Sequence, residues 1–213
     1  MKNIAKKTAE YLLQIKAIKL QPSNPFTWAS GWKSPIYCDN RKTLSFPVVR
    51  TFIRDSFAEM LKELYPDAGL VAGVATGAIA HGALVADKLG LPFVYVRSGA
   101  KEHGLGNRIE GYFTPGQKTV VIEDLISTGG SSLGAVQALR EAGCEVLGML
   151  AIFTYEFTKA GDAFTAAGCK LDTLGNYSEL IEAALETGYI GKAEEETLRN
   201  WRMDPANWGL KNK

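Results

Sequence analysis

Apolar residues recur at helical spacing in two segments of the N-terminal part of the chain. The first segment predicts an amphipathic helix whose apolar or weakly polar side chains are Ile4, Thr8, Tyr11, Leu12 and Ile15, with lysines between them. A second helix is predicted from about residue 48 to 64, opened by Pro47, a residue that fits the first turn of a helix. Its apolar stripe comprises Val49, Phe52, Ile53, Phe57, Met60, Leu61 and Leu64. We expect each helix to cover part of a core with its apolar face.

Short apolar runs farther along the chain are typical of buried strands. They span residues 69–74, 93–96, 119–122 and 146–153. Helical patterns at 79–89 and 132–142 lie between or after them. Strands that alternate with helices of about 10–15 residues indicate a parallel sheet with helices on both faces. The sequence therefore predicts an α/β fold.

The C-terminal segment is predicted to be helical. Asn176 suits an N-cap, Glu179 follows at the third position, and Pro205 ends the last helix. We therefore expect one domain over residues 1–213, with three parts. These are a small N-terminal cap or hood region at 1–44, an α/β core at 45–175 and a C-terminal helical extension at 176–213.

Composition and charge exclude several classes of protein. Of 213 residues, 24 are Lys or Arg and 23 are Asp or Glu, so the formal net charge is +1. Hydrophobic residues make up 46% and charged residues 22%, which argues against disordered, collagen-like and disulfide-scaffold classes. A near-neutral chain is not expected to offer the broad basic surface that binds nucleic acid. A small, highly charged anion needs only a few local donors and stays possible.

Cysteine usage and the apolar runs bear on the compartment. The three cysteines, Cys38, Cys144 and Cys169, are widely separated, which predicts free thiols in a reducing cytoplasm rather than a disulfide framework or a zinc site. The longest apolar stretch, 69–86, contains four glycines. The N-terminus lacks a continuous apolar core. We therefore expect neither a membrane span nor a signal peptide.

The segment 119–133, TVVIEDLISTGGSSL, carries the clearest chemical signal. A predicted strand ends in the carboxylates Glu123 and Asp124, and a Ser/Thr/Gly loop then opens a helix. Backbone N–H groups at a helix N-terminus favour a phosphate, and ligands gather beyond the carboxyl ends of parallel strands. The acids would face hydroxyl groups or a divalent metal. A sugar 5′-phosphate therefore fits both the acidic pair, through its hydroxyls, and the loop, through its phosphate. The alternative is an ordinary surface turn with a solvated acidic pair. The loop has no Gly-Lys-Ser/Thr of a Walker A motif.

Residues 123–131, EDLISTGGS, resemble the phosphoribosyl-diphosphate-binding motif of type I phosphoribosyltransferases. Three further segments resemble the orotate phosphoribosyltransferases of that family. They are 26–31 with 34–41 (FTWASG and SPIYCDNR), 73–78 (GVATGA), and the stretch from Arg97 through 101–104 (KEHG) to 109–111 (IEG). The resemblance covers about residues 26–153, in order. It implies the type I phosphoribosyltransferase fold.

The resemblance implies transfer of ribose 5-phosphate from phosphoribosyl diphosphate to N1 of orotate, with Mg²⁺ as cofactor bound mainly through the substrate. Lys101, His103 and Asp124 are the implied catalytic residues, and residues 97–108 the implied lid. The phosphoribosyl diphosphate would be bound by Arg97, Lys101, His103, Glu123, Asp124, Leu125, Ile126, Ser127, Thr128, Gly129, Gly130 and Ser131. Glu123 and Asp124 would hold the ribose hydroxyls, and the turn 75–77 the diphosphate. The family's lid reaches across a dimer interface, which implies a homodimer; the cytoplasmic expectation comes from the cysteine usage and the missing membrane span.

Orotate recognition departs from the family pattern. Ser127 is an expected orotate contact. Many members have an arginine after the last strand that engages the orotate carboxylate, but here residues 153–156 read FTYE. Ala29 likewise replaces a lysine of some members, and Ser98 a second basic residue after Arg97. A buried carboxylate needs a paired donor, so we expect Arg41, or Lys33, to supply it.

Other positions have a structural interpretation. We expect His81 to be a packing residue, and the aromatic cluster of Phe26, Trp28, Trp32 and Tyr37 to be mainly packing. Trp201 and Trp208 are interpreted as packing residues of the tail.

Two other functions stay open at this stage: a type I phosphoribosyltransferase for a purine or uracil, and a non-catalytic regulator that kept the fold. The expected lid and the expected base region favour orotate chemistry over both.

Overall fold

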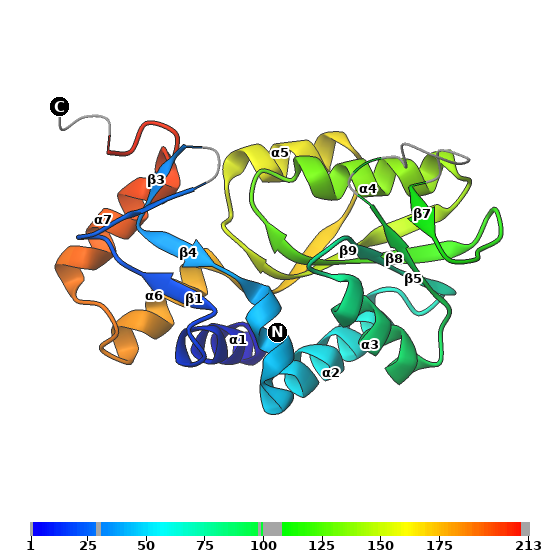
Figure 1. Cartoon of the computed structure of the whole chain (residues 1–213), viewed down its shortest axis with the longest axis horizontal. Coiled ribbons are helices and arrows are strands. Elements are labelled where there is room, and N and C mark those ends of the chain that lie inside the picture. Colours follow the sequence, from blue (N-terminus) through cyan, green and yellow to red (C-terminus); the bar gives the residue numbers. More distant parts are fainter. Residues whose placement is uncertain (1, 29–30, 98, 100–107, 210–213) are drawn as a thin grey trace.

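A six-stranded sheet forms the centre of the computed structural model, which describes residues 2–28, 31–97, 99 and 108–209 (Figure 1). Its strands, in spatial order, are β10 (Leu171–Asn176), β9 (Glu145–Thr154), β8 (Lys118–Ile126), β5 (Leu70–Val74), β6 (Phe93–Val96) and β7 (Ile109–Glu110). All neighbours are parallel except β7, which pairs with β6 in the antiparallel direction. The sheet confirms the predicted α/β fold.

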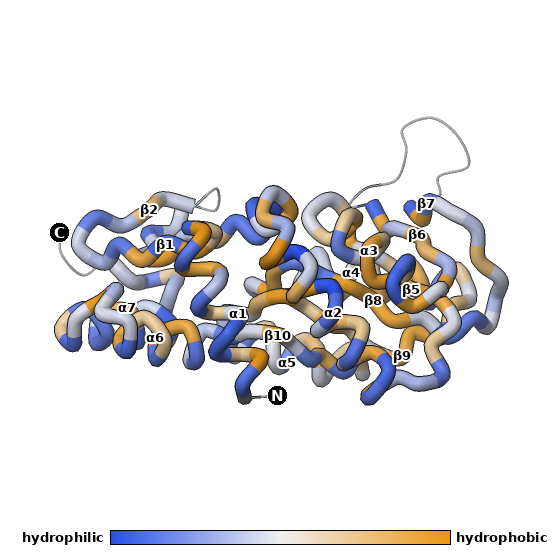
Figure 2. The backbone as a smooth tube through the Cα atoms, turned by 90° about the horizontal axis from the view of Figure 1, so that it is seen from below, coloured by the Kyte–Doolittle hydropathy of each residue, from blue (hydrophilic) through white to orange (hydrophobic). Residues whose placement is uncertain are grey.

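Helices cover both faces of this sheet (Figure 1). On one face lie α2 (Pro47–Leu64) and α3 (Ile79–Leu89), and on the other α4 (Gly130–Glu141) and α5 (Thr158–Ala166). Alternate strand residues serve the two cores: Val120 and Ile122 pack toward α2 and α3, whereas Val121 packs toward α4. Figure 2 shows how strongly apolar β8 and β9 are between these layers. A parallel sheet buried on both faces requires such near-continuous hydrophobic strands.

The two ends of the chain pack together at one end of the sheet. The N-terminal part contains α1 (Lys2–Gln14), two antiparallel strand pairs and the 3₁₀ helix Asn40–Ser45. The strand pairs are β1 (Ile18–Leu20) with β4 (Ile36–Cys38), and β2 (Phe26–Thr27) with β3 (Lys33–Ser34). The C-terminal helices α6 (Tyr177–Glu186) and α7 (Lys192–Met203) lie beside them (Figure 1). The hood predicted at 1–44 is thus built from both ends of the chain, and from here the name hood covers residues 2–28, 31–45 and 177–203.

The bounds predicted from the sequence agree closely with those of most core elements. Helix α3 and strand β6 have the predicted bounds, and Pro47 is the first residue of α2. Asn176 caps α6 as expected: its side-chain oxygen accepts a hydrogen bond from the backbone N–H of Glu179 at 2.9 Å. Strand β10 and helix α5 were not predicted. The expected boundary at 175/176 falls within the end of β10.

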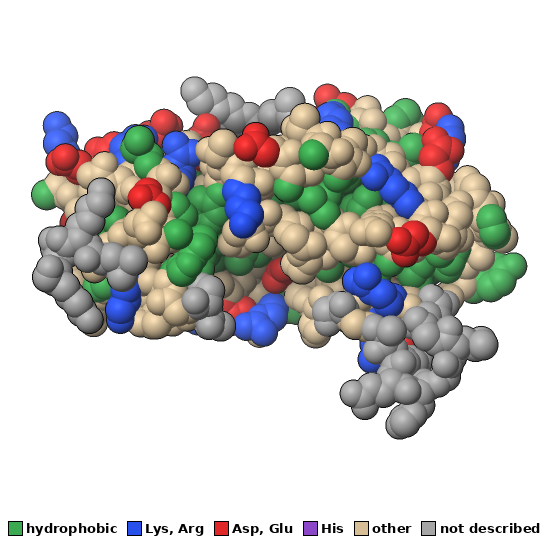
Figure 3. Space-filling model, turned by 90° about the horizontal axis from the view of Figure 1, so that it is seen from above, with side chains coloured by type: hydrophobic (Ala, Val, Ile, Leu, Met, Phe, Trp, Pro, Cys, Tyr) green, Lys and Arg blue, Asp and Glu red, His purple; other side chains and the backbone are tan. Residues whose placement is uncertain are grey.

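Charged side chains are interspersed on the face drawn in Figure 3, where Lys and Arg lie among Asp and Glu and hydrophobic side chains reach the surface between them. Positively and negatively charged side chains are thus mixed over this face rather than gathered in separate patches. Within the described ranges, none of the helices is both long and apolar enough to cross a membrane.

Candidate functional site

The carboxyl ends of β5 and β8 lie side by side where the strand order reverses. From β5 the sheet continues to β6 on one side, and from β8 it continues to β9 on the other. In open α/β sheets such a reversal opens a crevice that binds ligands, because the loops after the two strands diverge. The two loops here are residues 75–78 and 127–129. Two motifs that stand far apart in the sequence therefore meet at this crevice.

Asp124 lies directly against the turn that follows β5. A Cβ atom added to Gly77 would stand 2.1 Å from the Asp124 carboxylate oxygen Oδ2, so only glycine leaves room for this side chain. The Ala75–Thr76 peptide bond in the same turn is cis. From the hood side, the Asn40 amide donates a 2.6 Å hydrogen bond to the backbone oxygen of Asp124. Asn40 was part of a recognised segment, but nothing in the sequence signalled this role.

Glu123 turns away from the crevice toward α4. Its Oε1 accepts a hydrogen bond from the backbone N–H of Asp124, and its Oε2 accepts one from the Ser132 hydroxyl, both at 2.8 Å. The side chain is only 5% exposed. Burial, followed by repulsion from Asp124, raises the pKa of Glu123 to about 8. The two adjacent acids therefore differ: Asp124 faces the crevice, whereas Glu123 connects the end of β8 to the first turn of α4.

The loop after β8 presents the start of α4 to solvent. Gly129 has φ +83°, a left-handed conformation, and a Cβ atom there would come within 3.0 Å of the Phe164 ring. Gly130 and Ser131 are exposed, and the first turn of α4 contains no acidic residue. Unpaired N–H groups at such a helix start suit a phosphate. Ile126 is fully buried in the core, so any contact it makes with a ligand comes from its backbone.

Arg97 follows β6 and lines a cavity of about 170 Å³ that also borders Ala75, Gly130 and Ser131. Its Nη1 lies 3.5 Å from Glu110 Oε1. This cavity joins the turn after β5 to the start of α4. The other expected lid residues, Lys101 and His103, lie outside the described residues, as do Ala29 and Ser98.

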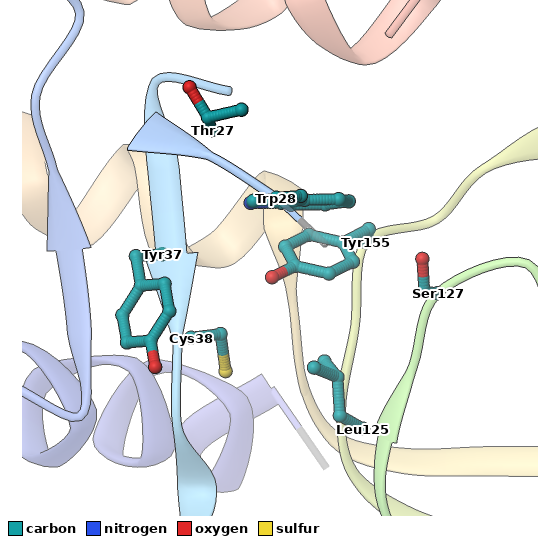
Figure 4. Close-up of a pocket in the computed structure, with 7 residues that line it drawn as sticks. All are labelled: Thr27, Trp28, Tyr37, Cys38, Leu125, Ser127 and Tyr155. Carbon is teal, nitrogen blue, oxygen red and sulfur yellow. The ribbon is translucent and has the colours of Figure 1, made fainter. Parts of the chain in front are cut away.

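A second cavity, of about 270 Å³, lies between the hood and the end of β8 (Figure 4). Its lining comprises Thr27, Trp28, Tyr37, Cys38, Leu125, Ser127 and Tyr155. Figure 4 shows the Tyr155 hydroxyl directed toward the side formed by Tyr37 and Cys38, with Leu125 and Ser127 on the opposite side. Trp28 and Tyr155 lie with ring centroids 5.3 Å apart. The cavity therefore has aromatic walls and opens toward the loop after β8.

Polar groups in this cavity are uncharged. Burial raises the pKa of the Tyr155 phenol and of the Cys38 thiol well above their ordinary values, so both keep their protons at neutral pH. The Cys38 thiol donates to Asn40 Oδ1 at 3.3 Å. Such walls suit a flat, polar ring better than a cation or a phosphate.

Trp201 of α7 forms the support behind these walls. Its ring meets Trp28 and Tyr155 edge to face, with centroids 5.6 and 5.8 Å away, and it is fully buried. The sequence interpretation of Trp201 as tail packing missed this link to the cavity. Hydrophobic spacing along α7 indicates a buried residue, but not which partners it contacts.

The two cations expected to bind the orotate carboxylate have different surroundings. Lys33 Nζ donates to the Thr27 hydroxyl at 2.7 Å, and Thr27 lines the cavity. Arg41 instead pairs with Asp39 at 2.7 Å and is largely exposed. Lys33 forms no ion pair within the part of the chain that the structure describes. Thr154, which stands where many family members have an arginine, is buried.

His81 lies on α3 behind the turn after β5 and is 1% exposed. Its Nε2 lies 3.0 Å from the Thr43 hydroxyl, which donates to the Asn40 backbone oxygen. Burial lowers the pKa of His81 to about 4, so the ring is neutral at pH 7. This burial agrees with the packing interpretation.

Comparison with known proteins connects this site with an enzyme family. Residues 47–170 match the family model described as "Phosphoribosyl transferase domain". Orotate phosphoribosyltransferase of Porphyromonas gingivalis is 59% identical over 210 residues, which is 99% of this chain and 100% of that protein. The enzyme of the same name from Listeria monocytogenes is 59% identical over 97% of this chain and 99% of its own. The crystal structure of orotate phosphoribosyltransferase from Aeropyrum pernix superposes with a TM-score of 0.75 at 27% identity, covering 86% of this chain and 99% of that chain.

The buried Glu123 makes a testable contribution to stability. Since its pKa is raised in the folded state, the native protein holds a proton that the unfolded chain releases between about pH 4.5 and 8. The contribution of Glu123 to the free energy of unfolding should therefore fall as pH rises through this window. Glu123→Gln, which mimics the protonated carboxyl, should flatten that dependence in urea unfolding. Glu59→Gln, at an exposed position on α2, is the control. Parallel curves for wild type and Glu123→Gln would contradict the assignment.

Proposed function

The chain belongs to the orotate phosphoribosyltransferases of the phosphoribosyltransferase family, and we propose that it transfers ribose 5-phosphate from phosphoribosyl diphosphate to N1 of orotate. The products are orotidine 5′-monophosphate and diphosphate, a step of pyrimidine biosynthesis. The observation that carries this proposal is that a helix start suited to an anion, the Asp124 carboxylate and an uncharged aromatic cavity meet at one crevice.

In our proposal the donor lies along the carboxyl ends of β8 and β5. Residues 127–131 bind the 5′-phosphate through backbone N–H groups at the start of α4. Asp124 accepts hydrogen bonds from the ribose hydroxyls, and the turn 75–77 supports the diphosphate. Glu123 contributes by fixing the backbone of Asp124, because both of its oxygens are already engaged. Leu125 and Ser127 then border both the ribose and the base.

The reaction breaks the bond between C1 of the ribose and the diphosphate oxygen, which keeps the electron pair. N1 of orotate forms the new bond and loses its proton. Because C1 becomes positive and the leaving group negative, catalysis depends on stabilising the departing charge. Arg97 stands at the edge of the crevice, and we assign Lys101 and His103 to the same task. The aromatic walls of the base cavity keep water away from C1.

Mg²⁺ is the metal that we propose for this site. Asp124 presents a hard carboxylate oxygen beside the diphosphate turn, and Mg²⁺ is commonly held by one or two carboxylates together with substrate phosphates. Asp124 and the substrate's own oxygens would therefore hold it. When bound, the ion neutralises phosphate charge.

Recognition of the orotate carboxylate falls, in our proposal, to Lys33. Its ammonium group lies beside Thr27 at the cavity and has no competing carboxylate among the described side chains, whereas Asp39 already neutralises Arg41. Ser127 approaches the base from the opposite side. Arg41 remains the second candidate: the hydrogen bond and charge of Asp39 raise its pKa most, and smaller contributions come from Tyr37, which lines the cavity, and from Asp124.

We further propose a cytoplasmic homodimer in which the lid of one subunit serves the site of the other. The three free thiols fit a reducing compartment. The shared lid follows from the resemblance of residues 97–104 to the family's lid.

The first test mixes the purified protein with orotate, phosphoribosyl diphosphate and Mg²⁺ and follows the loss of orotate absorbance. We expect turnover, reduced by about 10²-fold or more in Asp124→Asn because a group that acts at the reacting sugar is lost. Uracil, adenine and hypoxanthine serve as alternative acceptors. Turnover with one of these and none with orotate would overturn the proposal.

The carboxylate partner is tested by Lys33→Met and Arg41→Met. Loss of a charge-assisted hydrogen bond costs about 1.5–3 kcal/mol, so Lys33→Met should raise the KM for orotate about 10-fold or more. The KM for phosphoribosyl diphosphate should stay unchanged in this variant. If Arg41→Met has the larger effect on orotate while folding normally, Arg41 is the partner instead.

Mixed dimers test the shared lid. Lys101→Ala and Asp124→Asn subunits are each expected to be nearly inactive alone. Mixing them should restore part of the activity, since a heterodimer contains one site with an intact lid and an intact carboxylate. Heterodimers verified by mass that remain inactive would argue for a lid that acts within its own subunit.

A further inference from the structure

Arg108 stands opposite Arg97 at the end of the β6–β7 strand pair. The antiparallel ladder pairs Tyr95 with Glu110 and Val96 with Ile109, and it continues to these arginines through a 2.8 Å hydrogen bond from Arg97 N–H to Arg108 O. Arg108 Nε also donates to the Arg97 backbone oxygen at 3.2 Å. Directly opposed residues of an antiparallel pair share one face of the sheet. The two guanidinium groups therefore leave the sheet on the same side.

Both arginines line the 170 Å³ cavity that borders the phosphate-binding elements. Ala75 of the turn after β5 and Gly130 and Ser131 at the start of α4 complete its polar side. The guanidinium of Arg108 rests on the first turns of α4, since a Cβ atom added to Gly134 would stand 3.7 Å from Arg108 Nη2. The position is thus inside the crevice region rather than on an outer surface.

The charges in this cavity are unbalanced. Like charges directly opposite each other destabilise a strand pair, and a cation beside a helix N-terminus meets its positive end. The first turn of α4 has no acidic residue. Arg97 has Glu110 at 3.5 Å, but Arg108 forms no ion pair with any side chain in the described ranges. Two guanidinium groups and a helix start therefore converge on a space that an anion would fill.

We propose that Arg108 is a second phosphate-binding arginine of this site, forming with Arg97 a pair that grips a phosphate of the phosphoribosyl donor. Arginine suits this task because its planar fork donates two hydrogen bonds to phosphate oxygens. In sequence, Arg97 is followed by Ser98 and Gly99, so the strand end itself supplies one cation. Arg108 adds the second from the opposite strand. This role rests on the proposed function, since it assigns the anion to that donor.

The test compares Arg108→Gln and Arg108→Lys with the control Arg199→Gln, which removes an exposed arginine of α7 that pairs with Glu195. Binding of ribose 5-phosphate and of inorganic diphosphate to the full chain is measured by calorimetry. We expect Arg108→Gln to weaken at least one of them about 10-fold, with Arg108→Lys between it and wild type. The ligand that weakens more identifies the phosphate that Arg108 contacts. The difference should shrink at about 1 M salt, where charges are screened within about 3 Å.

A purely structural Arg108 would give a different result. In that case Arg108→Gln would lower the unfolding temperature but leave the dissociation constants of both phosphates at wild-type values, and this outcome would overturn the proposal. Equal weakening in Arg108→Gln and the Arg199→Gln control would overturn it as well. If Arg108→Gln does not fold, Arg108→Gly and Arg108→Met replace it. Wild-type dissociation constants for both phosphates in these two variants, at every salt concentration, would overturn the proposal. Binding is measured without orotate, so failure of the proposed reaction in the wild-type protein is a separate result.

Discussion

The parallel pairing of β5 with β8 is the constraint on which the site depends. Leu70 to Gly73 pair with Thr119 to Ile122, so both strands end at the same edge of the sheet. The chain then departs in opposite directions, to β6 and to β9. Because the sheet is buried on both faces, a ligand reaches it at the strand ends, and this edge is the one where the strand order reverses. The carboxylate, the helix start and the turn that meet there are consequences of one strand pairing.

The pleat of β8 explains why two adjacent acids have different surroundings. Successive side chains of a strand point to opposite faces, so Glu123 meets Ser132 of α4 while Asp124 meets Gly77 on the other side. A buried, protonated carboxyl accepts hydrogen bonds from β8 and α4 without adding charge to the crevice. The half-buried Asp124 instead lies against the turn after β5, at the crevice. Two neighbouring carboxyl groups of one strand thus have separate surroundings: one joins β8 to α4, and the other faces the crevice.

Sequence patterns predicted the elements whose formation is determined by residues near one another in the chain. Helix α2, helix α3 and the loop after β8 were found because apolar periodicity, Pro47 and the Ser/Thr/Gly run mark them directly. Strand β10 has a mixed sequence, LDTLGN, and exists because it pairs with β9 and is covered by α1. Asn40, Trp201 and Arg108 gained their roles from partners at least 11 positions away. No pattern along one segment reports such contacts.

The aromatic side chains around the 270 Å³ cavity come from segments that are synthesised at different times. Trp28 emerges from the ribosome early, Tyr155 later, and Trp201 only near the end of the chain. Segments made first generally fold first. The sheet edge with the loop after β8 can therefore form on a nascent chain in which Trp28 and Tyr155 still lack the support of Trp201. The aromatic cavity thus depends on the last helix of the chain, although no residue of that helix lines it.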